Sequence, residues 1–399
     1  MMSTAPTARR RASLLLFAVV LLDMIGFGIV IPILPFITPR LGGGEFDIAL
    51  IIAVYAVFAA MISPLWGRLS DRIGRKPVLM LCTTGAACAY LLLAVADELW
   101  MIYAARALAG IMAGNFPVAS AMMADLTTSA DRARGMGLVG AAFGLGLVLG
   151  PVLGGLLAGP EGSFLWPCLL AACMSIAAVV AAWLFLPESR QPRETEHHAG
   201  RAGLWHVLRA TQSRLLLLQY FLHTGSISAV TYLFPLWVYA MLDWQAREVG
   251  IVFGVVGAIM ALNQGVLMGR FLNVVGEVTL LRICTSLFLV GLLLTLFASG
   301  AVAMVASLIL ALGGATLCMP VLNAMTSRRG GIDDRGRLLG AASAAAGVGR
   351  IAGPIIAGGL LSLGNFTLAW GLPFAMVVVY WLWAWSHWAT REPPLQAAV

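Results

Sequence analysis

Twelve apolar runs of about 20 residues constrain what this 399-residue chain can fold into. Such a run crosses the hydrocarbon core of a bilayer as an α-helix, which satisfies its own backbone hydrogen bonds. A soluble chain with 60% hydrophobic and 11% charged residues could not bury its apolar surface. The sequence therefore predicts an all-α membrane protein. Its predicted spans are 13–37, 47–66, 78–96, 99–123, 135–158, 164–186, 214–241, 248–268, 278–298, 301–323, 338–363 and 367–388.

The two halves of the chain repeat each other. A constant offset of 203 residues aligns prolines and glycines of spans one, four and five in each half. The aligned pairs include Pro32/Pro235, Pro117/Pro320, Gly150/Gly353 and Pro151/Pro354. We expect two pseudo-symmetric six-helix lobes at 1–186 and 214–399, joined by a cytoplasmic linker at 187–213. Parallel repeats with a binding cavity at their interface are typical of transporters.

The basic residues predict the orientation in the membrane. If both termini are cytoplasmic, the cytoplasmic segments and the span ends next to them hold 21 of the 25 Lys and Arg residues, and the outer loops hold only Arg40 and Arg247. We therefore expect an inner (plasma) membrane protein with both termini inside. The positive charge indicates orientation in the bilayer rather than nucleic acid as a partner. The basic stretch before the first run resembles a signal peptide but has no clear cleavage site, so we expect an uncleaved first span.

Four motifs carry a family resemblance. They are the charged stretch Gly67–Leu79 (GRLSDRIGRKPVL), RALAGIMAG with Arg106, the glycine row that begins at Gly146 in span five, and LDMIGFGIVIPILP with Asp23. The chain resembles the major facilitator superfamily and, within it, the twelve-span drug:proton antiporters, tetracycline exporters included. The resemblance implies secondary transport by alternating access. It implies no enzymatic activity.

Asp23 is the acidic residue placed deep in a predicted span. An ionised carboxylate at mid-membrane costs at least about 3 kcal/mol, so such groups usually face a cavity, pair or titrate. Arg106 lies at a comparable depth in span four, so a contact is possible. In related antiporters the span-four arginine is tied to proton coupling, and we expect Asp23 and Arg106 to couple proton uptake to the conformational change. A fixed structural ion pair is the alternative.

Polar, aromatic and methionine residues within the spans are candidates to line a substrate cavity. Interhelical hydrogen bonding and ordinary packing are the alternatives for them. Arg350, in span eleven, has Leu147 at its aligned position, so it can serve an anionic substrate group, a gate or the structure. The candidates are Tyr55, Phe58, Asn115, His223, Tyr232, Met260, Asn263, Gln264, Asn323 and Arg350.

Two motifs predict structural devices. The charged stretch should form a cytoplasmic gate, in which Asp71 meets the start of span eleven near Arg337 and Leu338, and Arg75 pairs with Asp125. The gate residues are Gly67, Asp71, Arg72, Gly74, Arg75 and Asp125. Small residues let helices approach closely and proline bends a helix, so the span-five motif should be a packing seam. Its residues are Gly146, Gly150, Pro151, Gly154 and Gly155.

No nucleophile–base pair, phosphate-binding loop or metal cluster stands out in the sequence. The six cysteines all fall within apolar runs, and we expect buried thiols without a disulfide or metal role. We expect no cofactor, with the proton gradient as energy source. We also expect a functional monomer whose partners are a small molecule, protons and the lipid bilayer.

The chain departs from the tetracycline branch of the family. Ala89, Phe288 and Met260 stand where that branch carries acidic residues in spans three and nine and a histidine in span eight. These differences argue against export of a tetracycline–metal chelate, and a neutral, anionic or lipophilic substrate fits better than a dication. We expect proton-coupled export of small amphipathic compounds, as in multidrug or antibiotic efflux. Export of an endogenous metabolite such as a sugar, siderophore or amino-acid derivative is the alternative, followed by a lipid transporter or a membrane sensor on the same fold.

Overall fold

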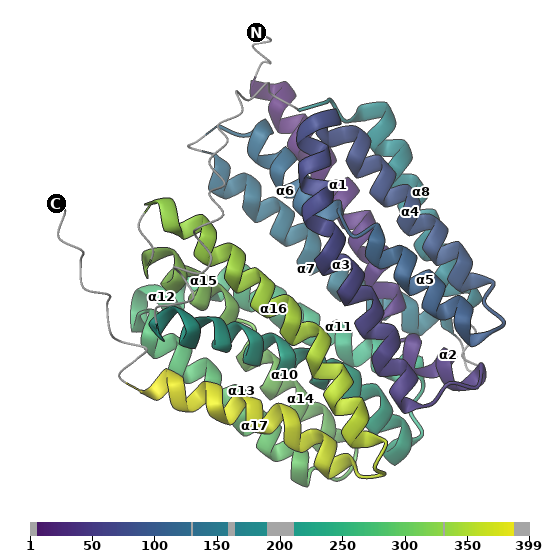
Figure 1. Cartoon of the computed structure of the whole chain (residues 1–399), viewed down its shortest axis with the longest axis vertical. Helices are drawn as coiled ribbons and strands as arrows, with labels where there is room; N and C mark the ends of the chain where they lie inside the picture. Colours follow the sequence, from purple (N-terminus) through teal and green to yellow (C-terminus); the bar gives the residue numbers. More distant parts are fainter. Residues whose placement is uncertain (1–5, 129–130, 159–163, 190–210, 330–331, 387–399) are drawn as a thin grey trace. The chain divides into compact units, whose positions relative to one another are not determined.

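The computed structural model describes residues 6–128, 131–158, 164–189, 211–329 and 332–386, and these form helices and short connections without a β-strand (Figure 1). The helices of the first half are α1 (Pro6–Val30), α2 (Leu34–Arg40), α3 (Glu45–Ile73), α4 (Arg75–Ala94), α5 (Leu99–Ile111), α6 (Asn115–Leu126), α7 (Arg132–Ala158) and α8 (Leu165–Phe185). The helices of the second half are α10 (Thr211–Leu242), α11 (Ala246–Leu262), the π-helical η1 (Asn263–Leu267), α12 (Met268–Val275), α13 (Glu277–Phe297), α14 (Ala301–Ala315), α15 (Cys318–Arg329), α16 (Ile332–Leu361) and α17 (Phe366–Trp385).

The chain divides into two compact units. The first comprises Met1–Thr195 with Val238–Ala261, and the second comprises Glu196–Trp237 with Leu262–Val399. In the first unit α1 packs along α7 and α8, and α4 packs against α8. In the second unit α13 packs against α14 and α17. The boundaries expected for the two six-helix lobes stay a prediction, and most of the linker lies outside the described residues.

Eleven of the described helical segments are long and apolar enough to cross a membrane. They coincide with eleven of the twelve predicted spans. The remaining predicted span, the eighth at 248–268, is interrupted. Here α11 is followed by the π-helical η1 and then by the short α12. The side-chain amides of Asn263 and Gln264 donate to the carbonyl oxygens of Gly313 and Thr316, at 3.2 and 3.4 Å. These bonds tie the interruption to the end of α14.

Spans four and ten are each broken at the same point of the repeat. α5 ends at Ile111 and α6 starts at Asn115, just before Pro117; α14 ends at Ala315 and α15 starts at Cys318, just before Pro320. A proline lacks the amide hydrogen and its ring clashes with the carbonyl four residues earlier. The repeat seen in the sequence thus reappears as a repeated helix break, and the first break positions Asn115.

The charged stretch Gly67–Leu79, expected to be a loop, is almost entirely helical. α3 continues to Ile73 and α4 starts at Arg75, so Gly74 alone links them. Gly74 has φ +114°, a conformation open to glycine but strained for other residues. A single glycine with positive φ turns the chain sharply enough for both helices to extend past the apolar run.

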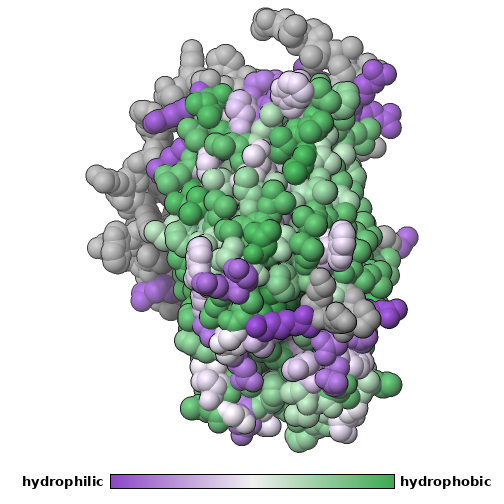
Figure 2. Space-filling view, turned by 90° about the vertical axis from the view of Figure 1, so that its right-hand side faces the viewer, coloured by the Kyte–Doolittle hydropathy of each residue, from purple (hydrophilic) through white to green (hydrophobic). Residues whose placement is uncertain are grey.

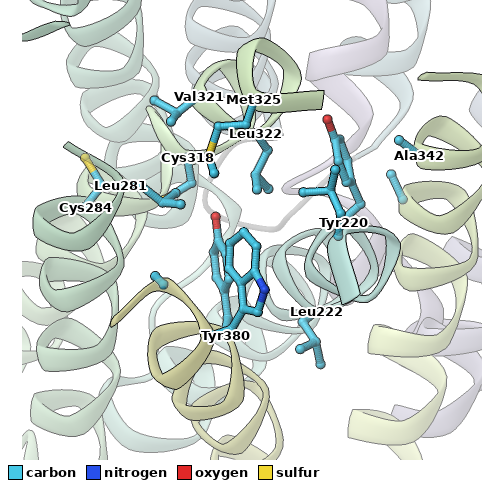
Figure 3. Packing of buried hydrophobic residues seen from close by; sticks show 14 of the residues in the cluster. Tyr220, Leu222, Leu281, Cys284, Cys318, Val321, Leu322, Met325, Ala342 and Tyr380 are labelled. Atoms are coloured by element: carbon cyan, nitrogen blue, oxygen red, sulfur yellow. The ribbon is translucent and has the colours of Figure 1, made fainter. Parts of the chain in front are cut away.

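The buried cores and the surface are both apolar. In the second unit Tyr220, Leu281, Cys318 and Tyr380 converge from α10, α13, α15 and α17 (Figure 3). On the outside, apolar side chains cover wide areas (Figure 2), and Met61 and Trp166 are 66% and 62% exposed. Soluble monomers rarely expose such patches, whereas lipid tails accept them. The chain is a multi-pass membrane protein, and this explains why Cys88 and Cys173 are exposed although burial was expected.

Candidate functional site

A buried hydrogen bond joins Asp23 of α1 to Asn115 at the first position of α6. Asn115 Nδ2 donates to Asp23 Oδ2 at 2.7 Å, and the two residues are 4% and 8% exposed. Asp23 Oδ1 and Asn115 Oδ1 have no hydrogen-bond partner among the described residues. A buried carboxylate that keeps one unsatisfied oxygen is a group on which a proton can be bound and released.

Arg106 of α5 is buried without an ionic partner. Its guanidinium carbon lies 4.5 Å from the centre of the Tyr55 ring, and it is 6% exposed. Within the described part of the chain no carboxylate oxygen lies within 4.0 Å of its guanidinium, and its Nε has no hydrogen-bond partner. The expected contact between Asp23 and Arg106 is therefore absent from this structure. Asn115 donates to one oxygen of the carboxylate instead, and an aromatic face stabilises the cation.

Close helix contacts hold Tyr55 in place. A Cβ added to Gly110 of α5 would lie 2.6 Å from the carbonyl oxygen of Tyr55 and 2.9 Å from Cβ of Phe58. Glycine at this point lets α5 approach α3, so that Arg106, one turn away, reaches the Tyr55 ring. The ring of Phe27 on α1 lies 5.4 Å from that of Tyr55. Of the predicted cavity residues, Tyr55 thus lies beside Arg106 and Phe58 lies beside Gly110, and both are half-buried.

The glycine row of α7 packs on the helix that carries Asp23. An added Cβ on Gly146 would meet Met24, one on Gly150 would lie 2.6 Å from Cα of Gly28, and one on Gly154 would meet Ile29. The next residue, Gly155, has its close contacts with Ala246 and Arg247 of α11. Pro151 lies inside α7 between these contacts. The glycine row therefore packs against two helices, α1 and α11.

The predicted ion pair between Arg75 and Asp125 is present. Arg75 Nε lies 3.1 Å from Asp125 Oδ2, Arg75 Nη2 lies 2.7 Å from Asp71 Oδ1, and Nη1 donates to Ser70 Oγ at 2.6 Å. Arg75 is buried, whereas Asp71 and Arg72 are exposed. Gly67 has open space around it. The side chain of Arg337, the expected neighbour of Asp71, lies outside the described residues, and that contact stays a prediction.

Glu188, which sequence reasoning missed, binds the start of α4. Its Oε1 and Oε2 accept from the backbone amides of Arg75 and Lys76 at 2.9 and 3.1 Å, and Lys76 Nζ donates to the carbonyl of Trp183 at 2.9 Å. Gly74, the residue before α4, has no side chain to cap these amides. A carboxylate from beyond α8 replaces the missing cap and suits the positive end of the helix dipole. The only signal in the sequence was an acidic residue directly after span six.

The other predicted cavity residues differ in how exposed their side chains are. His223 and Tyr232 are 1% and 0% exposed, and His223 packs edge-on against Phe288 and Tyr380 with centroids 6.3 and 5.7 Å apart. Their burial gives them places in the core rather than on an open cavity. Asn323 is exposed and accepts from the Tyr220 hydroxyl at 2.8 Å.

The four remaining candidates have partly open positions. Met260 is half-buried, and Asn263 and Gln264 hold the η1 contacts described above. Arg350 of α16 is exposed, and its carbonyl accepts from Ser228 Oγ at 3.0 Å. A cavity of about 360 Å³ in the second unit is lined by none of the predicted residues. Its lining is Arg214, Leu217, Leu218, Phe221, Ala345 and Val348.

Comparison with known proteins identifies relatives along most of the chain. The family model described as Major Facilitator Superfamily matches residues 16–273 and 264–399. The class C tetracycline resistance protein of Escherichia coli is 32% identical over 385 residues, which cover 92% of this chain and 95% of that protein. Major facilitator superfamily domain-containing protein 10 of Bos taurus is 30% identical over 336 residues, which cover 77% of this chain and 71% of that protein.

Solved structures have the same fold at lower identity. The human organic anion transporter MFSD10 (TETRAN) superposes with a TM-score of 0.71 at 23% identity, over 96% of this chain and 100% of that one. The nucleoside transporter NupG, solved as a point mutant, gives a TM-score of 0.81 at 13% identity, over 94% and 100%. The fold of this chain is thus one that transporters share.

Proposed function

Because the chain belongs to the major facilitator superfamily, we propose that it is a proton-coupled secondary transporter that exports small amphipathic compounds by alternating access. Its tetracycline-resistance relatives support drug or antibiotic efflux as the physiological activity. The charge asymmetry of its loops supports an inner-membrane location with both termini in the cytoplasm. Ala89, Phe288 and Met260, at places where the tetracycline branch has titratable groups, favour a substrate other than a metal–tetracycline chelate.

The observation that carries this proposal is the environment of Asp23. Its carboxylate is buried, bonded on one oxygen to Asn115 and unpaired on the other. Adding a proton removes a charge that the surrounding apolar helices tolerate poorly. The protonated and ionised forms therefore favour different arrangements of α1 and its neighbours, and this is how a proton gradient can shift a conformational equilibrium.

Transport in proteoliposomes tests the coupling. Purified protein is reconstituted with a pH-sensitive dye inside, and candidate drugs are added to wild type and to Asp23→Asn. We expect wild type to couple drug movement to counterflow of protons, and Asp23→Asn to lose gradient-driven transport by at least about 100-fold, because a neutral amide cannot cycle a proton. Asp97→Asn, at an exposed acidic residue between α4 and α5, is the matched control.

Two outcomes would overturn the proposal. Drug movement with no proton flux in wild type would remove proton coupling, and full gradient-driven transport by Asp23→Asn would remove Asp23 from it. A resistance profile of an expressing strain decides between drug efflux and the alternative, export of an endogenous metabolite. Lower susceptibility to at least one drug class is expected for efflux, and an unchanged profile for every drug would favour the metabolite.

A further inference from the structure

Positive charge outweighs negative charge in the middle of the described spans. With His counted as neutral, the charged side chains placed far from the span ends there are Asp23, Arg106 and Arg350. In the described part of the chain, neither arginine has a carboxylate oxygen within 4.0 Å of its guanidinium. With Asp23 ionised the three groups sum to one positive charge. Protonation of Asp23 leaves two.

Of these two arginines, Arg106 is the buried one and Arg350 is exposed. The Nε of Arg106 has no hydrogen-bond partner among the described residues, and the guanidinium of Arg106 lies over the face of Tyr55. A ring face stabilises the cation from one side but accepts none of its in-plane hydrogen bonds. A guanidinium held over a ring in this way still needs acceptors for its fork of N–H donors. That fork matches a carboxylate, sulfonate or phosphate group.

The carboxylate of Asp23 does not bind the guanidinium of Arg106. Asp23 Oδ2 accepts from Asn115 Nδ2 at 2.7 Å, and no ion pair joins Asp23 to Arg106. A buried charge without a partner is costly, so a site of this kind is completed by a ligand of the opposite charge. The neighbouring side chains Phe27, Tyr55 and Phe58 are aromatic, and suit the apolar body of the same ligand.

We propose that Arg106 binds an acidic group of the transported compound, so that the substrates of this transporter are amphipathic organic anions. This inference rests on the proposed export function and adds the chemical class of its cargo. The direction also fits, because a membrane potential that is negative inside drives anions outward. Arg106 is then a binding residue for the substrate, in addition to any part it has in coupling to Asp23.

Matched acid and amide probes test the charge preference. Purified wild-type protein is titrated with 1-naphthaleneacetate and 1-naphthaleneacetamide, and with benzoate and benzamide, while thermal unfolding is followed; uptake into proteoliposomes is measured for the same pairs. Ligand binding adds RT ln(1 + [L]/Kd) to the free energy of unfolding, so at one ligand concentration the tighter ligand raises the unfolding temperature more. We expect each acid to bind about 10- to 100-fold more tightly than its amide, the range expected for one charge-assisted guanidinium contact.

Variants of Arg106 test whether this residue causes the preference for the acid over the amide. Arg106→Gln should bring the acid and the amide to equal affinity, and Arg106→Lys should restore part of the difference because it keeps the charge without the fork. Arg282→Gln is the control, since Arg282 Nε donates to the Ala384 carbonyl at 3.0 Å and its guanidinium lies 5.2 Å from the Trp385 ring. It should keep the wild-type preference. Unfolding temperatures without ligand show whether each variant is folded.

The outcomes separate this inference from the proposed function. Equal binding of acids and amides by wild type, or binding of neither, overturns the anion inference even if a neutral drug still drives proton flux through Asp23. A preference for acids that survives in Arg106→Gln shows that Arg106 is not the anion-binding group. Failure of every compound, charged or neutral, to move with protons overturns the proposed function itself.

Discussion

The bond from Asn115 to Asp23 links two helices at a point where neither side chain meets bulk water. We predict a coupling free energy of about 1–2 kcal/mol between Asp23→Ala and Asn115→Ala, near the upper end for polar pairs in membrane proteins, because the acceptor is a carboxylate. A double-mutant cycle of reversible unfolding in mixed micelles measures it. Strictly additive losses would mean that the bond contributes nothing to stability.

At the residue scale the sequence indicates which groups are unusual but not what they touch. Asp23 and Arg106 stand out because a charge in an apolar run is costly, and that argument needs no structure. Their partners depend on rotation and depth of each helix, and the break before Pro117 moves Asn115 to the start of α6 beside Asp23. A residue count along straight helices therefore suggested a contact of Asp23 with Arg106 that the structure lacks.

At the element scale, α7 offers two glycines with opposite surroundings. A Cβ on Gly150 would lie 2.6 Å from Cα of Gly28, whereas one on Gly144 meets nothing within 4 Å. We predict that Gly150→Ala lowers the free energy of unfolding by about 1–3 kcal/mol through forced separation of α1 and α7. Gly144→Ala should raise it by about 0.5–1 kcal/mol, since alanine favours a helix. Unfolding in micelles compares them, and equal effects would contradict the tight seam.

The start of α4 gives a second test at this scale. Glu188→Gln removes the charge that accepts from the amides of Arg75 and Lys76, and we predict a loss of about 1–2 kcal/mol in unfolding free energy. Asp97→Asn, at an exposed acidic residue in the connection between α4 and α5, is the matched control and should change stability by less than about 0.5 kcal/mol. High salt should leave part of the difference in place, because two backbone amides donate to Glu188. Indistinguishable variants would argue against a cap.

Helix ends were harder to predict than helices. Hydropathy located eleven spans that the structure confirms, because about 20 apolar residues have few other stable forms in lipid. It gave no sign of the η1 interruption, which depends on where the amides of Asn263 and Gln264 find carbonyl acceptors. Nor did it show that α3 runs on to Ile73, since polar residues continue a helix as readily as apolar ones. Glu188 was missed because the backbone amides that donate to it, those of Arg75 and Lys76, are distant in sequence.

At the scale of the whole molecule, duplication and charge were the informative signals. The offset that aligns Pro117 with Pro320 predicted two related halves, and both prolines follow a helix break in the structure. Charge predicts orientation, because cytoplasmic loops retain Lys and Arg. The sequence carries no comparable signal for the substrate: specificity depends on a few side chains whose neighbours come from several helices.

The last prediction concerns orientation. In a variant with all six cysteines replaced by serine or alanine, Asp97→Cys lies between α4 and α5 and Thr128→Cys follows α6. We expect a membrane-impermeant maleimide to label Asp97→Cys in intact cells and Thr128→Cys only after permeabilisation, because the loop after α6 lies on the same side as the basic stretch at Arg72–Lys76. Both positions are exposed, so access differs only by the side of the membrane. The opposite pattern would invert the topology and place the charged stretch and both termini on the outer side of the membrane.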